Sequence, residues 1–297
     1  MKLLTFEYNG KEETGILSAD GEKVIPLSKL EINYSDMNDL IDNITEKEME
    51  MAEAAANADP DSIVAFFKRD VNMRAPIVRP KQDVICLGIN YADHAVESSR
   101  YKNEAFGGER PYPIYFSKRV NEAVGDGEQV QAHADIVERL DYEVEIAVII
   151  GKPAYKVSRE EALDFVFGYT ILNDISARDI QTRHKQWYFG KSMDGFTPIG
   201  PWIVTADEIP DPGHLAIKSY VNGELRQNGN TDQMIFDIPY VIEQLSQGIT
   251  LIPGTIIAMG TPAGVGMGFE PPKFLNKGDE VVCELEGIGT LTNVIGD

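Results

Sequence analysis

The chain is built around the stretch Leu140-Asp141-Tyr142-Glu143-Val144-Glu145-Ile146-Ala147-Val148-Ile149-Ile150-Gly151. It predicts a β-strand, because it is rich in Val, Ile and Tyr and stops at a glycine. Strand side chains alternate between two faces, so Glu143 and Glu145 project from one side, while Tyr142, Val144 and Ile146 pack on the other. The apolar run that follows indicates a strand buried on both faces.

Two carboxylates on a buried strand need a compensating cation. When Glu143 and Glu145 are both ionised they repel each other and lose hydration, at a cost of several kcal/mol per ion. A divalent metal ion is the natural compensator. The alternative is that both acids line the solvated face of an exposed strand. The continuous apolar run beside them favours burial, where unpaired carboxylates are least tolerated.

A second strand supplies a third acid. The sequence Gly168-Tyr169-Thr170-Ile171-Leu172-Asn173 predicts a core strand that ends at Asp174. With Glu143 and Glu145, Asp174 would give three oxygen ligands. Such a set favours Mg²⁺ or Mn²⁺, and less strongly Ca²⁺, over Zn²⁺, which prefers His and Cys.

Composition describes an ordinary soluble globular protein. The 297 residues are 43% hydrophobic, enough for one large domain or two unequal ones. The formal charge of -21 argues against nucleic acid and anionic membrane surfaces as partners. Cys86 and Cys283 lie far apart in apolar runs, as buried free thiols of a reducing compartment do. With no signal-peptide core and no membrane-span run, we expect a cytoplasmic protein.

We expect two domains, a small one over residues 1–75 and a catalytic one over 76–297. In the first, the pattern predicts strands at residues 3–8 and 14–17, and helices at 35–57 and 61–68. The prolines of Arg74-Ala75-Pro76-Ile77-Val78-Arg79-Pro80 favour an extended linker, which sets the boundary.

A histidine and a glutamate lie three residues apart after the strand expected at residues 83–88. On a helix with Asn90 as its N-cap, His94 and Glu97 are neighbours. They either form a base that deprotonates water or an ordinary surface pair; spacing alone leaves both open. Residues 98–113 are polar with Gly and Pro, the composition of a lid loop.

Two further segments have the composition of ordered functional loops. Residues 186–202 are dense in Gly, Pro and aromatics, and Lys191 among them either supplies positive charge to an oxyanion or is a surface lysine beside Asp194. Near the end of the chain, residues 256–266 predict a strand that enters a glycine-rich turn, whose backbone N–H groups and Thr261 could hold a carboxylate. No helix is expected after this turn, which excludes a dinucleotide or phosphate loop.

Together these segments resemble the fumarylacetoacetate hydrolase family over roughly residues 83–294, and the closest likeness is to the shorter fumarylacetoacetate hydrolase domain-containing proteins. The matching stretches are G-I-N-Y-A-D-H-A-V-E, D-Y-E-V-E-I-A-V-I-I-G, N-D-I-S-A-R-D, K-Q-W-Y-F-G-K-S-M-D-G-F-T-P-I-G-P and G-T-P-A-G-V-G. The resemblance implies an α+β, mainly β fold: a mixed β-sandwich roll with a small N-terminal α/β unit. It also implies a homodimer.

The resemblance further implies roles for single residues. Glu143, Glu145 and Asp174 would hold Mg²⁺ or Mn²⁺, and His94 with Glu97 would activate water. Lys191 would contact the substrate or its reacting oxygen. The other expected substrate contacts are Gln181, Gly260, Thr261 and, as a weaker match, Lys118.

The activity expected from these assignments is cleavage of a C–C bond in a small-molecule 2-oxo acid of the acylpyruvate or fumarylpyruvate type, as a catabolic hydrolase. The metal and Lys191 would stabilise the enolate that cleavage leaves. Without water, the same stabilisation would serve decarboxylation or keto–enol tautomerisation of an oxaloacetate-like or hexenedioate-like diacid. A non-catalytic, metal-binding scaffold is the alternative of a different class.

Overall fold

The protein is described by a computed structural model that covers residues 1–58, 64–102 and 111–297. The expected strand at residues 140–151 forms, but as two pieces, β9 (Leu140–Asp141) and β10 (Val144–Ile150). Between them the Glu143 N–H donates to the Asn173 side chain and the Val144 N–H to the Gln227 side chain, so side-chain acceptors replace ladder bonds at the point of the break. Every residue of β10 is buried, as expected from the sequence.

The larger sheet runs in the order β4-β3-β2-β1-β13-β11-β10-β16-β6-β7, with β5 also paired to β1. Its pairs are antiparallel except β16 with β6. The bounds of its strands besides β10 are β1 Lys2–Tyr8, β2 Lys11–Leu17, β3 Lys23–Pro26, β4 Phe66–Phe67, β5 Asn72–Arg74, β6 Val84–Gly88, β7 Ile114–Lys118, β11 Val166–Asn173, β13 Ile199–Thr205 and β16 Ile256–Ala258.

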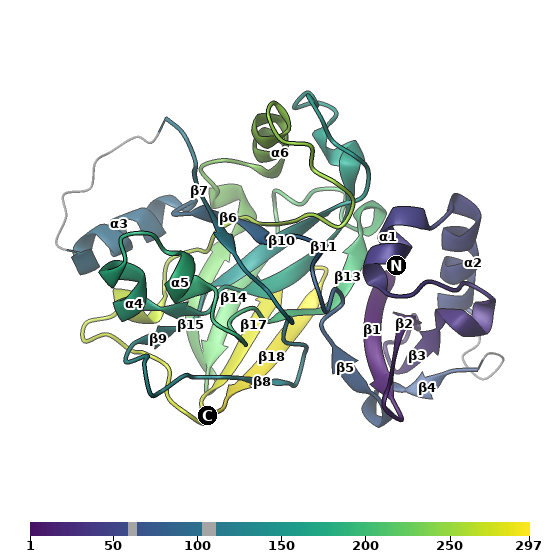
Figure 1. The fold of residues 1–297 in the computed structure, drawn as a ribbon, viewed down its shortest axis with the longest axis horizontal. Coiled ribbons are helices and arrows are strands. Elements are labelled where there is room, and N and C mark those ends of the chain that lie inside the picture. The colour runs from purple at the N-terminus through teal and green to yellow at the C-terminus, as the bar shows by residue number, and fades with distance from the viewer. Residues whose placement is uncertain (59–63, 103–110) are drawn as a thin grey trace.

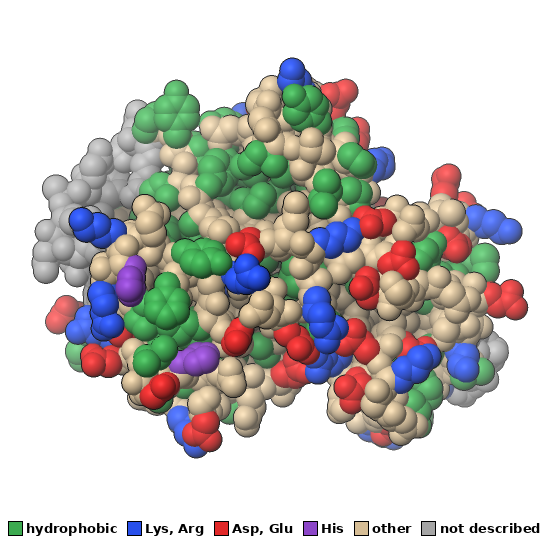
Figure 2. Space-filling model, viewed as in Figure 1, with side chains coloured by type: hydrophobic (Ala, Val, Ile, Leu, Met, Phe, Trp, Pro, Cys, Tyr) green, Lys and Arg blue, Asp and Glu red, His purple; other side chains and the backbone are tan. Residues whose placement is uncertain are grey.

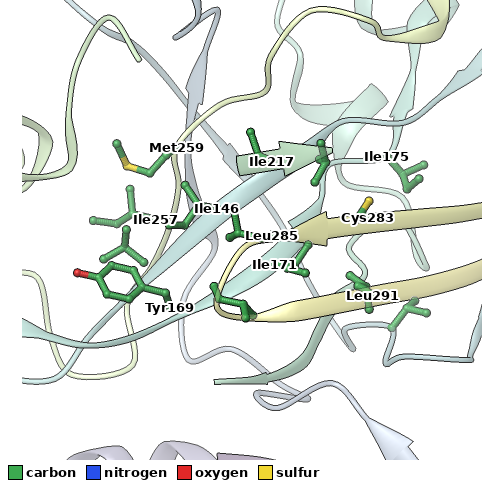
Figure 3. Close-up of a cluster of buried hydrophobic side chains, with 14 of the residues drawn as sticks. Ile146, Tyr169, Ile171, Ile175, Ile217, Ile257, Met259, Cys283, Leu285 and Leu291 are labelled. Atoms are coloured by element: carbon green, nitrogen blue, oxygen red, sulfur yellow. The ribbon is translucent and has the colours of Figure 1, made fainter. Parts of the chain in front are cut away.

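A second sheet of five strands lies in the order β15-β14-β17-β18-β8, and β9 pairs with β12 (Ser176–Ala177) in a third, two-stranded sheet. The five strands are β8 Gln129–Val130, β14 Ala216–Val221, β15 Glu224–Asn230, β17 Glu280–Leu285 and β18 Gly289–Ile295. Side chains from β10, β11 and β16 point toward side chains from β14, β17 and β18 and form the main core (Figure 3). The mixed, mainly β fold expected from the sequence is confirmed.

Six α-helices are described, around the periphery of these sheets (Figure 1): α1 Met37–Asn43, α2 Glu46–Ala56, α3 Ala92–Lys102, α4 Arg178–Arg183, α5 Tyr188–Lys191 and α6 Ile238–Ser246. The single helix expected at residues 35–57 is two, because Thr45 caps the start of α2 through its side chain. The helix expected at 61–68 is wrong where it can be checked: β4 and a short 3-10 helix, Lys68–Asp70, occupy its end, and residues 59–63 lie outside the described part.

Helix α3 differs from expectation at both ends. Asn90 is not its cap, because the Asn90 amide is buried and bonds the carbonyls of Phe236 and Met259 and the N–H of Phe236. The helix continues to Lys102, so residues 98–102 are helix and not part of the expected loop; the polar residues there include no helix breaker. Residues 103–110 lie outside the described part.

The N-terminal strands extend the main sheet, since Leu3 of β1 pairs with Ile203 of β13. Figure 1 shows β1 to β5 with α1 and α2 on one side of the molecule, beyond β13. Figure 2 shows the face of the molecule that is turned to the viewer in Figure 1. Acidic and basic side chains are interspersed over it, and hydrophobic side chains gather below α6. Over residues 1–58, 64–102 and 111–297, no helix is long and apolar enough to cross a membrane.

Candidate active site

Three acids meet where β10 and β11 lie side by side. Glu143 precedes β10, Glu145 lies within it, and Asp174 follows β11; the antiparallel register pairs Val144 with Asn173 and so brings the acids together. All three are buried, and their carboxylate oxygens lie within 4.8 Å of one another. The sequence prediction that these acids converge is therefore confirmed.

Cations surround two of the three acids. The Lys191 Nζ lies 2.8 Å from Glu143 Oε2 and 2.6 Å from Asp174 Oδ2. The Lys118 Nζ lies 2.5 Å from Asp174 Oδ1, and an Arg178 guanidinium nitrogen lies 2.6 Å from Glu143 Oε1. Because each pair is buried, its attraction is screened less than at the surface.

Glu145 is the acid that these cations compensate least. In the described part of the chain no lysine or arginine pairs with it, and its Oε2 accepts only the Gly260 N–H, at 2.7 Å. Burial, together with the charges of Asp174 and Glu143, raises the pKa of Glu145 well above its usual value. For Glu143, burial acts in the same direction, but the charges of Lys191 and Arg178 outweigh it and hold its pKa well below its usual value.

The donor set fits a hard divalent ion. Its ligands are carboxylate oxygens, the type that Mg²⁺, Mn²⁺ and Ca²⁺ prefer, and in one of them, Glu145, the repulsion of its acidic neighbours and burial outweigh the charge of Lys191. A cation shared by Glu143, Glu145 and Asp174 would remove the repulsion that raises the Glu145 pKa.

The glycine-rich turn after β16 holds three protein carboxylates through its backbone. The Gly260 N–H donates to Glu145, the Gly264 N–H donates to Glu97 at 3.0 Å, and the N–H groups of Gly266 and Met267 donate to Asp141 at 2.6 and 3.0 Å. The sequence indicated that this turn could hold a carboxylate. These N–H groups bind carboxylates of the chain itself, and they hold the side chains of Glu145, Glu97 and Asp141 in place.

The histidine and glutamate of α3 form a largely buried pair rather than a surface pair, with His94 buried and Glu97 partly exposed. The His94 Nδ1 lies 3.0 Å from Glu97 Oε2, and His94 is 5% exposed. An ionised carboxylate at Nδ1 favours the imidazole tautomer with its proton on Nδ1, which leaves the Nε2 lone pair available to accept a proton. When His94 is protonated, its charge also lowers the Glu143 pKa, as a smaller effect than those of burial, Lys191 and Arg178.

A cavity of about 590 Å³ opens onto these groups. It is lined by five of the residues that the sequence singled out: His94, Glu143, Gln181, Lys191 and Thr261. The Thr261 hydroxyl donates to the Val144 carbonyl at 2.8 Å and accepts from Gln227 at 2.7 Å. Lys118 is 0% exposed and is not among the lining residues, so its contact with substrate stays a prediction.

Sequence reasoning gave no role to Arg178, Asp141 or Gln227, which all lie buried at the site. Arg178 bridges Asp141 and Glu143, donates to Gln181 at 3.2 Å and lines the cavity. Arg178 stands in the motif N-D-I-S-A-R-D and Asp141 in D-Y-E-V-E, and the signal available in the sequence was an arginine shortly after Asp174. No signal in the sequence pointed to Gln227, because it lies on β15 of the five-stranded sheet and not on the strands that carry the acids.

Comparisons with known proteins agree on one family. The family described as fumarylacetoacetate (FAA) hydrolase C-terminal matches residues 83–296. The oxaloacetate tautomerase YisK of Bacillus subtilis (strain 168) is 43% identical over 307 aligned positions, which cover 100% of both chains.

Two solved structures show the same fold. One is a fumarylacetoacetate hydrolase of the psychrophilic Exiguobacterium antarcticum, 37% identical, with a TM-score of 0.83 and coverage of 100% of this chain and 99% of that one. The other is a 2-hydroxyhepta-2,4-diene-1,7-dioate isomerase of Mycobacterium marinum, 30% identical, with a TM-score of 0.74 and coverage of 100% and 98%. The names of these relatives span tautomerase, hydrolase and isomerase chemistry.

Proposed function

The chain belongs to the fumarylacetoacetate hydrolase family, and from that premise we propose that it enolises a 2-oxo acid at a divalent metal, with keto–enol tautomerisation of an oxaloacetate-like acid as its activity. One observation carries the proposal: Glu143 of the acid triad, its partner Lys191, and His94 of the His94–Glu97 pair line one cavity. Tautomerisation stands ahead of C–C hydrolysis because a tautomerase is 43% identical over the full length.

Each group has a role in this proposal. Glu143, Glu145 and Asp174 would hold a divalent ion, which would supply Lewis-acid polarisation of the keto oxygen. The ammonium of Lys191 donates hydrogen bonds to the oxygen on which negative charge develops. His94 Nε2 takes a proton from the carbon beside the keto group and returns it to the oxygen, so keto and enol forms interconvert with no atom gained or lost.

Glu97 and the cavity walls complete the proposed site. Glu97 keeps the His94 ring oriented and stabilises its protonated form. Gln181 and Thr261 contact substrate from the cavity wall, while Gly260 acts through the Glu145 carboxylate that its N–H binds. Lys118, which does not line the cavity, balances the charge of Asp174 from the protein interior.

Hydrolysis of an acylpyruvate or fumarylpyruvate is the second candidate. It is favoured by the cavity volume of about 590 Å³, larger than a four-carbon acid needs, and by a His–Glu pair that could direct water. Decarboxylation of the same oxaloacetate-like acid requires no water and is the third. All three share the enolate step, so they share Lys191 and the acid triad.

The test is an assay panel on one preparation, with oxaloacetate, acylpyruvates and fumarylpyruvate in Mg²⁺, Mn²⁺ or chelator. We expect oxaloacetate to tautomerise fastest, with the rate lost in chelator. His94→Ala should lower that rate by about 10²- to 10⁴-fold, the range of general base catalysis. Acylpyruvate cleavage exceeding tautomerisation would promote the second candidate, and full activity in chelator would refute the metal proposal.

We also propose that the protein is a homodimer with a catalytic unit over residues 76–297, on grounds of family resemblance. The cytoplasmic location and a catabolic role remain predictions of the same kind. Sedimentation at micromolar concentration tests the dimer, since the chain mass is 32.9 kDa and a dimer has twice that. A species of monomer mass would contradict it.

A further inference from the structure

Asp141 is a buried carboxylate that the proposed chemistry does not use. It is 0% exposed and lies at the end of β9, two residues before Glu143. Its Oδ1 accepts the Gly266 N–H at 2.6 Å and the Tyr142 N–H at 3.0 Å; its Oδ2 accepts Arg178 Nε at 2.9 Å and the Met267 N–H at 3.0 Å. Both oxygens are therefore fully occupied by donors.

The contacts of Asp141 lead in two directions. Through Arg178 they reach Glu143, because the same guanidinium pairs with Glu143 Oε1 at 2.6 Å. Through Gly266 they reach the proton-transfer pair, because Gly264 of the same turn donates to Glu97, which contacts His94. A forked guanidinium held at both ends has one orientation.

We propose that Asp141 is a positioning residue that fixes Arg178, and through it Glu143, at a set distance from the His94–Glu97 pair. The inference rests on the proposed function, since it assigns Glu143 to the metal and His94 to proton transfer. Misplacement of such groups by about 1 Å lowers rates by about 10²-fold, and loss of partners that orient metal ligands weakens metal binding by about 10- to 100-fold.

The variant Asp141→Asn is matched in shape and breaks the arrangement. In either orientation of the amide, its NH₂ group faces two donors, so two of the four hydrogen bonds are lost. Arg178→Lys keeps the charge but cannot contact Asp141 and Glu143 at once, and it leaves the turn bonded to Asp141. Asp126→Asn is the control, because Asp126 accepts the Thr292 N–H outside the site.

Mn²⁺ affinity by calorimetry is measured first, without substrate. We expect Asp141→Asn and Arg178→Lys each to weaken Mn²⁺ binding about 10-fold, and the double variant to weaken it little further, because one acts through the other. In turnover, kcat should fall about 10²-fold with a smaller change in KM. The control should match the wild-type protein in both measurements.

The outcomes separate this inference from the proposed function. Failure of the wild-type protein to bind Mn²⁺ would refute the proposed function. Wild-type Mn²⁺ affinity and kcat in Asp141→Asn, with only a lower Tm, would reduce Asp141 to a structural role and overturn the inference. If Asp141→Asn does not fold, wild-type Mn²⁺ affinity and kcat in Arg178→Lys would overturn the inference instead, because Arg178 is the contact through which Asp141 acts on Glu143. Additive losses in the double variant would likewise overturn it.

Discussion

At the scale of single residues, Glu145 offers the sharpest test of the acid triad. Its carboxylate is buried beside two others and has no cationic partner in the described ranges, so its neighbours repel its charge in the metal-free protein. Glu145→Gln keeps the shape and an acceptor for the Gly260 N–H while removing the charge. We expect this variant to be more stable than the wild-type protein in chelator, and inactive.

The measurement is thermal unfolding with and without Mn²⁺. In chelator, a gain of about 1 kcal/mol would raise the Tm of Glu145→Gln by about 2–4 °C. Added Mn²⁺ should raise the Tm of the wild-type protein and leave that of the variant nearly unchanged. A variant that is less stable than the wild-type protein in chelator would contradict the account, because repulsion would then not dominate at this position.

At the scale of elements, helix α3 and the turn after β16 depend on a glycine at position 268. A Cβ on Gly268 would lie 1.7 Å from Glu97 Oε1 and 2.4 Å from its Cγ. The Glu97 side chain must then move, which is easy for a flexible carboxylate but separates it from His94. We therefore expect Gly268→Ala to lower kcat by about 10- to 100-fold at nearly wild-type Tm.

Gly248→Ala is the matched control for that change, since a Cβ there would meet nothing within 4 Å. It should leave kcat unchanged. If Gly268→Ala had normal kcat, the contact of Glu97 with His94 would be unnecessary for turnover. A large fall in Tm would show instead that the glycine serves the packing of α3 on the turn.

Alternation along residues 142–150 correctly placed Glu143 and Glu145 on one side, because strand periodicity needs no knowledge of partners. The break at Tyr142 was not predictable, since it depends on the side chains of Asn173 and Gln227. For the same reason Asp141 was missed, because the Gly266 and Met267 N–H groups that it accepts lie more than 120 residues away in the chain. Arg178 was missed because the carboxylates that it binds, those of Asp141 and Glu143, come from a different segment of the chain.

At the scale of the whole molecule, the mixed β fold followed from the resemblance, but the attachment of the N-terminal strands did not. Composition and prolines pointed to a boundary near residue 75, which stays a proposal supported by the start of the family match at residue 83. Backbone pairing of β1 with β13 could not be read from either strand. One apolar cluster contains Leu3 and Ile25 together with Ile149 and Ile203, so the two regions share a core.

This shared core predicts that the chain unfolds as one unit. Separating the N-terminal strands would expose both the β13 edge and the apolar face that Leu3 and Ile203 cover, so partial unfolding is disfavoured. Trp202 of β13 reports on the junction, because the ammonium groups of Lys2 and Lys68 lie 5.0 Å from its ring centroid. Trp187→Phe leaves Trp202 as the single tryptophan of the chain.

In that variant, urea unfolding followed by Trp202 fluorescence and by circular dichroism should give one coincident transition with a common midpoint. Ile203→Ala removes apolar contacts between β1 and β13 and should lower both urea midpoints together. The free energy of unfolding should fall by about 2–5 kcal/mol, the usual range for a large core truncation. A fluorescence transition that comes first, with most β-sheet signal retained, would mean that residues 1–75 detach alone. The sheet pairing of β1 with β13 would then be a docking contact between two domains, each with its own stability.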